Sequence, residues 1–382
     1  MKILLVSTGS GSRGGGEIFL DYLGQGLADR GHQVVMWIPA HPRMNELAEK
    51  CSRFSRIIRP DYRNTYDHRA RSLSTCFNWG VSRRAAREWN ELRPDIIHLN
   101  KQNLEDGLDL LRAVKQCSAP SICTIHLTQT AHHLRAQSPA LRDWIARNAL
   151  IRYPGVLVTV QEGRRAALDA FLGGRVRTRT IFNGVPLVDQ THLLPLRQAK
   201  RRELGLNDKD FLIIGLGRLV KQKQPFVFLE TARKLHQYFP ATKFLWVGDG
   251  NLSQQWNEWV TREGLGSFIS CAGWQTDATP FLLAADLLLH VAEYEGLPLA
   301  IIEAMAAGLP CAVTRNLTEE IPLFNEGNVF FTDDPVILAK RLQSASELDA
   351  IASNARQLVE NQLSLRGMVE AYEKLYGSVS RE

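Results

Sequence analysis

Short apolar runs alternate with segments of helical periodicity along the whole chain. Each run is nearly continuous in hydrophobic residues, as expected of parallel strands that are buried on both faces. The first half contains candidate strands at residues 2–8, 33–39, 56–59, 95–100, 121–126, 156–160 and 178–182. The second half contains candidate strands at residues 211–217, 243–247, 268–271, 286–291, 311–314 and 329–332. This pattern predicts two successive parallel sheets.

The segments between these strands predict helices with recognisable ends. Residues 17–30 carry a helical stripe of apolar side chains that stops at Gly31. Residues 225–239 begin with a proline, which the first turn of a helix tolerates. Residues 298–307 precede Gly308, and glycine often ends a helix in the left-handed conformation. Alternation of strands and helices predicts doubly wound α/β domains of the Rossmann type.

The boundary between the two series of elements lies in a segment without strand or helix pattern. Residues 184–202 are polar, basic and broken by Pro186 and Pro195, which is typical of a linker. The segment 365–376 predicts a last helix, which no strand follows. We therefore expect three parts: an N-terminal domain over 1–195, a C-terminal domain over 196–362 and a C-terminal helical segment over 363–382.

Length and charge agree with two globular domains, one of which is basic. The chain has 382 residues, and a domain commonly has roughly 150–200. The net charge of +6 is unevenly divided, because residues 1–190 hold 27 Lys or Arg against 17 Asp or Glu. This surplus predicts an anionic partner for the first domain, and a solvated basic face without a partner is the alternative. We expect no nucleic-acid partner.

The cysteines and the N-terminal residues predict a location. The six cysteines are scattered, with no CxxC pair, as is typical of reduced thiols in a cytosolic protein. The first apolar run spans only residues 3–6, whereas a signal peptide needs about 7–15 apolar residues. No run reaches the roughly 18–20 apolar residues of a membrane span. We expect a cytoplasmic protein, either soluble or peripheral at the inner face of the membrane.

A glycine-rich loop follows the first predicted strand and opens a helix. Residues 9–14 match G-x-G-x-x-G, and backbone N–H groups at a helix N-terminus bind anions. A dinucleotide site also requires an acidic residue at the end of the second strand. That strand ends in Trp37-Ile38-Pro39, without an acid. A nicotinamide-dependent oxidoreductase remains an alternative that this loop does not favour.

Two carboxylates follow the apolar strand 286–291. Glu295 lies in a loop before the predicted helix 298–307, and Glu303 lies within that helix in an apolar context. A carboxylate on an apolar helix face is costly unless it is hydrogen-bonded, and the hydroxyls of a bound ribose would satisfy it. An exposed or salt-bridged glutamate is the alternative for Glu303.

Two cations follow the strand 211–217. Arg218 and Lys223 lie on a strand-to-helix loop, at the edge where open α/β sheets bind ligands. Arginine binds phosphate bidentately and lysine acts as a point charge, so the pair suits a diphosphate. An ordinary basic loop is the alternative. The sequence Asp208-Lys209-Asp210 spells D-x-D, but it precedes a strand, where a solvated turn is expected; we predict no metal site.

These motifs occur in the order that is typical of one enzyme family. The chain resembles the family-4 retaining glycosyltransferases over about residues 1–335, and Glu295-x7-Glu303 is the most specific element. Four further elements support the resemblance: Gly217-Arg218-Leu219-x3-Lys223, Val247-Gly248-Asp249-Gly250, Asn183-Gly184-Val185 and Gly15-Gly16-Glu17. The resemblance implies a GT-B architecture, in which two Rossmann-like doubly wound domains face each other across a cleft. It also implies that the last helix crosses back to the N-terminal domain.

The resemblance assigns roles to individual residues. Arg218 and Lys223 would bind the donor diphosphate, Glu303 the ribose, and Glu295 the transferred sugar. His126 corresponds to the family's active-site histidine, and it counts as catalytic together with Arg218, Lys223 and Glu295; an ordinary strand-end histidine is its alternative. The other donor-binding positions are Gly15, Gly16, Asn183, Trp274 beside the nucleobase, Gly296 and Leu297. His98 is more ambiguous and is not assigned to the site.

The expected reaction moves a sugar from a UDP- or GDP-linked donor to an acceptor hydroxyl, with retention and without a cofactor or metal. Polysaccharide, lipid-linked saccharide or glycoconjugate synthesis is the expected context, and the basic first domain suits an anionic membrane surface. Two departures from the family pattern, at 291–292 and 315–320, affect the donor pocket. They leave open a catalytically inactive nucleotide-sugar-binding protein, and an epimerase of the same architecture is a further alternative.

Overall fold

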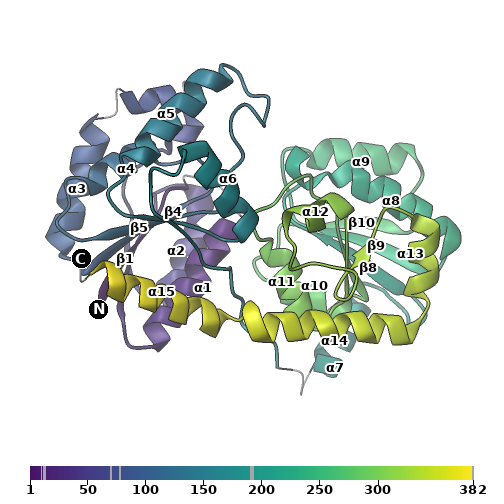
Figure 1. Ribbon diagram of the computed structural model, residues 1–382. Coiled ribbons are helices and arrows are strands. Elements are labelled where there is room, and N and C mark those ends of the chain that lie inside the picture. Colours follow the sequence, from purple (N-terminus) through teal and green to yellow (C-terminus); the bar gives the residue numbers. More distant parts are fainter. Residues whose placement is uncertain (10, 12–13, 69–70, 77–78, 190–192, 381–382) are drawn as a thin grey trace. The chain divides into compact units, whose positions relative to one another are not determined.

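The computed structural model of the protein describes residues 1–9, 11, 14–68, 71–76, 79–189 and 193–380. The chain divides into two compact units. One consists of Met1–Gly184 and Leu365–Glu382, and the other of Val185–Ser364. Each unit contains a parallel sheet with helices on both faces (Figure 1). The prediction of two doubly wound α/β domains is confirmed.

In the described part of the first unit, the strand order is β3-β2-β1-β4-β5-β6-β7. The strands are β1 (Lys2–Ser7), β2 (Gln33–Trp37), β3 (Arg56–Ile58), β4 (Ile96–Lys101), β5 (Ser121–Ile125), β6 (Val156–Thr159) and β7 (Thr178–Thr180). One face carries α1 (Gly15–Asp29), α2 (Asn45–Cys51) and the C-terminal α15 (Leu365–Val379). The other face carries α3 (Trp79–Leu92), α4 (Leu108–Val114) and α5 (Pro139–Ile151), and α6 (Glu162–Leu172) precedes β7 (Figure 1).

In the described part of the second unit, the strand order is β10-β9-β8-β11-β12-β13. The strands are β8 (Phe211–Leu216), β9 (Thr242–Val247), β10 (Ile269–Gly273), β11 (Leu287–His290), β12 (Cys311–Val313) and β13 (Phe330–Phe331). The helices are α7 (Leu193–Glu203), α8 (Pro225–Tyr238), α9 (Ser253–Arg262), α10 (Thr279–Ala284), α11 (Leu299–Ala306), α12 (Arg315–Glu320), α13 (Pro335–Leu342) and α14 (Ala345–Gln362). The chain leaves β8 toward β9 on one side and returns to β11 on the other, which makes a switch point between β8 and β11.

The apolar runs form strands because burying them on both faces removes their whole side-chain surface from water. In β1 the four residues from Ile3 to Val6 are completely buried, between β2 and β4. Each strand predicted from the sequence is present, with both ends within two residues of the predicted ones. The predicted helices at 17–30, 225–239, 298–307 and 365–376 correspond to α1, α8, α11 and α15.

The predicted linker over 184–202 is wrong in its second half, where the helix α7 begins at Leu193. Its arginines are not solvated linker charges. The guanidinium of Arg201 donates to Asp286 Oδ2 (3.0 Å), and it also donates to the carbonyls of Ala284 (3.0 Å) and Asp210 (2.6 Å). Arg197 forms an ion pair with the same carboxylate. These bonds attach α7 to the second unit, so that the units divide at Gly184–Val185 rather than near residue 195.

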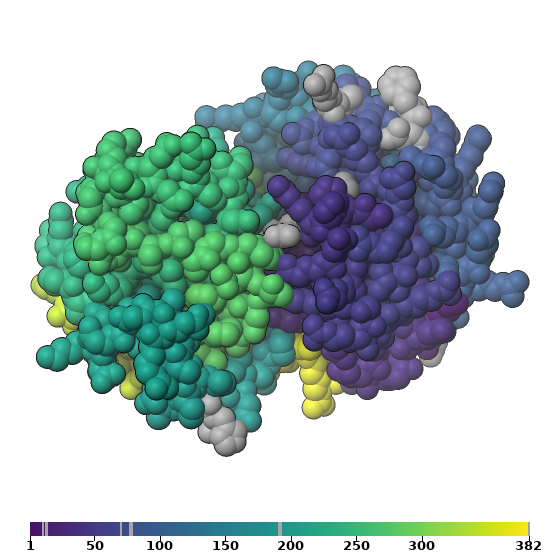
Figure 2. All heavy atoms as spheres, turned by 180° about the vertical axis from the view of Figure 1, so that it is seen from behind, coloured from purple at the N-terminus to yellow at the C-terminus, as the bar shows by residue number. Residues whose placement is uncertain are grey.

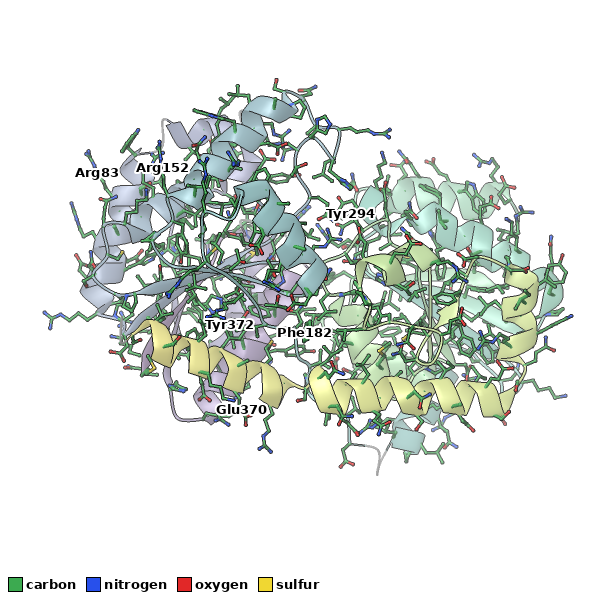
Figure 3. The ribbon with its side chains drawn as sticks, viewed as in Figure 1. Arg83, Arg152, Phe182, Tyr294, Glu370 and Tyr372 are labelled. Atoms are coloured by element: carbon green, nitrogen blue, oxygen red, sulfur yellow. The ribbon has the colours of Figure 1, made fainter. Side chains whose placement is uncertain are left out.

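The chain changes unit between its last two helices, α14 and α15. The helix α14 belongs to the second unit, and α15 belongs to the first, where it packs beside α1. Its Tyr372 and Tyr376 are completely buried. Figure 3 shows Tyr372 on the side of α15 that faces the sheet and Glu370 on the opposite side. Among the described residues, no helix combines the length and the apolar character needed to cross a bilayer.

Candidate functional site

The carboxyl end of β11 holds a buried ion pair that connects two loops of the second unit. Glu295, which is 6% exposed, pairs through Oε1 with the ammonium of Lys223 on the β8–α8 loop. The imidazole Nε2 of His290, the last residue of β11, lies 3.1 Å from the same oxygen. Since a carboxylate can only accept, His290 donates. Two donors therefore hold Oε1, and no described residue bonds to Oε2.

The charge of this cluster follows from its surroundings. Burial raises the pKa of Glu295, but the charge of Lys223 and the bond from His290 outweigh it and lower that pKa to about 2. Burial lowers the pKa of His290, although the bond to Glu295 opposes the shift. At neutral pH the cluster therefore contains an ionised carboxylate, a neutral imidazole and a lysine.

Backbone packing between two glycine motifs places Arg218. The amide of Leu219 donates to the carbonyl of Asp249 (2.7 Å), which joins the β8–α8 and β9–α9 loops. A Cβ on Gly248 would lie 2.1 Å from the carbonyl oxygen of Gly217, and one on Gly250 would lie 2.3 Å from that of Leu219. Both contacts are with backbone, so a larger residue would force the loops apart. These glycines thus have a structural role in the motif.

Arg218 itself is half-buried and has no ion pair among the described residues. It follows β8, whereas the Glu295 cluster follows β11, the neighbouring strand at the switch point. The two loops are also joined by backbone, because the amide of Glu293 donates to the carbonyl of Gln222 (2.9 Å). A guanidinium without an ion pair can bind an anion, and a carboxylate with one open oxygen can accept a hydrogen bond from a hydroxyl.

The remaining predicted residues of the second unit lie at the same carboxyl edge of its sheet. Trp274 directly follows β10, and Gly296 and Leu297 are buried in the loop that leads into α11. Glu303 is half-buried within α11. The departure at 315–320 forms α12, where the side-chain amide of Asn316 donates to the carbonyl of Glu293 (3.2 Å). That segment therefore contacts the loop that carries Glu295.

The carboxyl edge of the first sheet brings together three residues from different elements. His126, directly after β5, has its Nε2 2.7 Å from Oδ1 of Asn100 on β4. The amide nitrogen of Asn100 donates to the carbonyl of Gly16 on α1 (2.9 Å). Because the oxygen of Asn100 can only accept, the proton of His126 lies on Nε2 and its Nδ1 carries a lone pair. Burial lowers the pKa of His126 to about 4, so the ring is neutral.

His98 has a supporting position below this edge. Its Nδ1 lies 2.8 Å from the hydroxyl of Tyr376, and its Nε2 lies 2.8 Å from the hydroxyl of Thr124. The hydroxyl of Tyr372 contacts Thr124 at 2.9 Å. Burial, and to a lesser extent His126, lower the pKa of His98 to about 3. These bonds to α15 account for the histidine, which the sequence analysis left out of the site.

Two further predicted positions belong to the first unit. Gly15 is the first residue of α1, and Asn183 is buried near the end of the first segment of the unit. Within the glycine loop, Ser10, Ser12 and Arg13 lie outside the described residues. In the described ranges, no group of three or more His, Cys, Asp or Glu side chains is arranged to hold a metal ion. Asp208 and Lys209 form a turn, as predicted.

Two residues of these clusters were missed in the sequence, Asn100 and His290. Both are polar residues at the ends of apolar strands, where the carboxyl edge of a parallel sheet is built. That position is the signal that could have identified them. Neither belongs to a motif of the resemblance, so each needed the structure to find its partner.

Comparisons with known proteins agree with these two units. Residues 13–188 match the family described as Glycosyltransferase Family 4, and residues 197–362 match Glycosyl transferases group 1. An Escherichia coli UDP-Gal:alpha-D-GlcNAc-diphosphoundecaprenol alpha-1,3-galactosyltransferase is 29% identical over 296 residues, which cover 74% of this chain and 75% of that protein. The Rhizobium meliloti lipopolysaccharide core biosynthesis glycosyltransferase LpsE is 28% identical over 173 residues, 45% of this chain and 46% of that one.

Solved structures resemble the whole chain. Anabaena HepE in complex with UDP-glucose superposes with a TM-score of 0.76 at 20% identity, covering 99% of this chain and 100% of that one. Sucrose-phosphate synthase from Thermosynechococcus elongatus also gives 0.76, at 19% identity, covering 99% and 98% of the two chains. At these identities the likeness concerns the fold, and it confirms the predicted GT-B type.

Proposed function

This chain belongs to the family-4 glycosyltransferases, which take a sugar from a nucleotide donor, and on that premise we propose its donor, its site residues and its acceptor. The donor is a UDP-linked sugar. The acceptor is a hydroxyl of a saccharide, most simply one that is linked to a lipid diphosphate. The transfer retains the anomeric configuration. The E. coli relative acts on a UDP-sugar and a lipid-linked saccharide, and HepE binds UDP-glucose, which supports both parts of the proposal.

The observation that carries the proposal is that the β8–α8 loop holds both Lys223 of the Lys223–Glu295–His290 cluster and Arg218, which has no ion pair among the described residues. Arg218 would bind the donor diphosphate. The open oxygen Oε2 of Glu295 would accept a hydrogen bond from a hydroxyl of the sugar. Glu303 would bind the ribose and Trp274 the base. Gly296 and Leu297 would present backbone amides near the sugar or the phosphate.

The residues of the first unit supply neutral groups in this proposal. His126 presents an uncharged Nδ1, which accepts a hydrogen bond from a sugar hydroxyl. Gly15, Gly16 and Asn183 would approach the donor phosphate and sugar. The bond between the anomeric carbon and the β-phosphate oxygen breaks while the acceptor oxygen attacks on the same face. The acceptor proton passes to the departing phosphate.

Charge stabilisation of the leaving diphosphate comes from Arg218 and Lys223 in this scheme. Fixed cations that face developing negative charge lower the barrier without reorganisation. In the structure Lys223 is bound to Glu295, so Arg218 is the group that is ready to bind an anion. No side chain of either cluster is assigned as a covalent nucleophile.

A calorimetric screen tests the donor assignment. UDP, GDP, ADP and NAD are titrated into the wild type and Glu303→Ala, and UDP-glucose follows for the nucleotide that binds. We expect saturable binding of UDP. The variant should weaken it about tenfold, because it loses a bidentate bond to a pair of ribose hydroxyls. Binding of NAD alone, or of no nucleotide, would contradict the proposal.

A further inference from the structure

The first unit exposes aromatic residues on the face made by α3, α4 and α5. Trp79 on α3 is 55% exposed, and Trp144 and Leu141 on α5 are 62% and 46% exposed. Tryptophan is a large side chain that most proteins keep mostly buried, so two on one face need an explanation.

The helix α3 continues from its exposed tryptophan into arginine on the same stripe, and α5 is followed by an exposed arginine. On α3, Trp79 is followed by Arg83 and Arg87 at helical spacing of four, and both arginines are exposed. On α5, Trp144 is followed by the exposed Arg152, just beyond the end of the helix. Figure 3 shows Arg83 and Arg152 on the same side of the unit.

The short helix α4 lies between them. The guanidinium of Arg112 lies 4.1 Å from the centre of the Trp79 ring. Burial, and to a lesser extent the charges of Arg152 and Arg112, lower the pKa of Lys115. Arg84 adds a further exposed cation on α3, and Glu91 is the exposed acid of that helix. In Figure 2, which views the molecule from behind, side chains project outward from the blue segment that contains α3.

We propose that this α3–α5 face docks on a bilayer surface that contains anionic lipid. Tryptophan rings lie favourably at the level of the headgroups, and basic residues are attracted to an anionic membrane surface. A nucleic acid would also attract the cations, but it would not require Trp144 and Leu141 to be exposed. The inference rests on the proposed lipid-linked acceptor.

The orientation of α3 and α4 relates the proposed docking face to the carboxyl edge of the sheet. The hydroxyl of Ser82, in the first turn of α3, donates to the carbonyl of Asp109 on α4, and a Cβ on Gly107, just before α4, would lie 2.7 Å from the side chain of Thr8, directly after β1. The N-terminal ends of α3 and α4, and with them Trp79, are therefore at the carboxyl edge of the sheet, whereas Trp144 lies in the middle of α5. His126 lies at the same edge. Docking would bring that edge to the depth at which a lipid-linked saccharide is presented.

Vesicle sedimentation tests the proposal on the full chain. The vesicles contain phosphatidylcholine alone or with about 30 mol% phosphatidylglycerol, at about 0.05 M and about 0.5 M salt. The variants are Trp79→Ala/Trp144→Ala and Arg83→Glu/Arg87→Glu. The first control is Tyr238→Ala/Ile337→Ala, two side chains on the second unit that are about as exposed as the tryptophans. The second control is Arg175→Glu/Arg179→Glu, two exposed arginines of the first unit before and within β7.

We expect binding to the anionic vesicles that salt weakens, and about tenfold or greater loss in both variants but not in the controls. Three results would overturn the proposal: equal binding to both lipids, equal loss in the controls, or binding of a DNA duplex that the arginines control and the tryptophans do not. UDP binding, measured on the same preparations, should be unchanged in every variant. If wild type binds vesicles but not UDP, the docking face stands and the donor proposal fails.

Discussion

The carboxyl edges of the two sheets have the same architecture and opposite chemistry. In the second unit, the edge contains Lys223, an ionised Glu295 and an arginine without an ion pair among the described residues. In the first unit, the corresponding edge contains His126 and Asn100 in a neutral network, with His98 below it. Each edge lies where its strand order places the ends of neighbouring strands together.

The difference between the two edges shows what decides whether a buried ionisable side chain keeps its charge. A buried charge is retained only where a counter-charge and hydrogen bonds surround it, as Lys223 and His290 do for Glu295. Without a counter-charge, burial removes the charge, as it does for His126 and His98. The first arrangement suits an anionic ligand and the second suits hydroxyl groups. The proposed division between a donor edge and a sugar-facing edge follows from this contrast.

Removing the cation of the charged edge should have the largest effect. Arg218→Ala leaves the diphosphate without its bidentate partner, so we expect kcat/KM to fall about 100- to 1000-fold. Arg218→Lys should recover only part of it, because lysine acts as a point charge. The matched control is Arg233→Ala on α8, because Arg233 is half-buried like Arg218 but pairs with Glu230. Equal kinetics in Arg218→Ala and wild type would contradict the donor assignment.

Removing the hydrogen bond from His290 should shift the pH at which the Glu295 carboxylate titrates. With a pKa of about 2, Glu295 stays ionised as the pH falls from 8 to 5, so the affinity for UDP-glucose should not change through this group. His290→Leu removes a donor and leaves burial less opposed, which raises that pKa, so the affinity for UDP-glucose should begin to fall at a higher pH than in wild type. His290→Gln keeps a donor and should behave like wild type.

The affinity for UDP alone provides the control, because UDP lacks the sugar that Glu295 is proposed to bind. It should be the same in His290→Leu and in wild type at each pH. A parallel loss for UDP and UDP-glucose would instead indicate a general collapse of the loop.

Converting the neutral edge into a charged one should change its pH profile. In Asn100→Asp, the carboxylate faces Nε2 of His126, which raises the pKa of the imidazole from about 4 toward neutrality. The protonated ring loses its Nδ1 lone pair, so kcat should fall several-fold, about tenfold at most, as the pH drops below about 6.5. Histidine NMR reports the titration directly. Asn90→Asp, whose side chain bonds to the carbonyl of Gln116 on the surface, is the control.

The smallest effect is expected from the helix that supports the neutral edge. Tyr376→Phe removes the hydroxyl that contacts His98 and leaves a buried nitrogen without its partner, which should lower the free energy of unfolding by about 1–2 kcal/mol. Urea denaturation measures the change, and Tyr238→Phe, at an exposed position on α8, serves as the control. UDP affinity should be equal in both. A selective loss of UDP affinity in Tyr376→Phe would mean that α15 contributes to the donor site.

Prediction from the sequence was accurate where a local pattern sufficed. The apolar runs located the strands because a parallel strand must be apolar on both faces. Prediction failed at α7, where Arg197 and Arg201 appeared as linker charges. Their partner, Asp286, is more than eighty residues away in the chain, and nothing near the arginines indicates it.

The sequence by itself determined the two sheets, the glycine motifs and the candidates Arg218, Lys223, Glu295 and Glu303. It could do so because apolar periodicity and motif spacing are properties of neighbouring residues. Only the tertiary structure decided which groups are charged and which are paired. The bonds from Asn100 to Gly16 and from His98 to Tyr376 join residues 84 and 278 positions apart. Such bonds act over about 3 Å, so they exist only once strand order and helix packing have brought their atoms together.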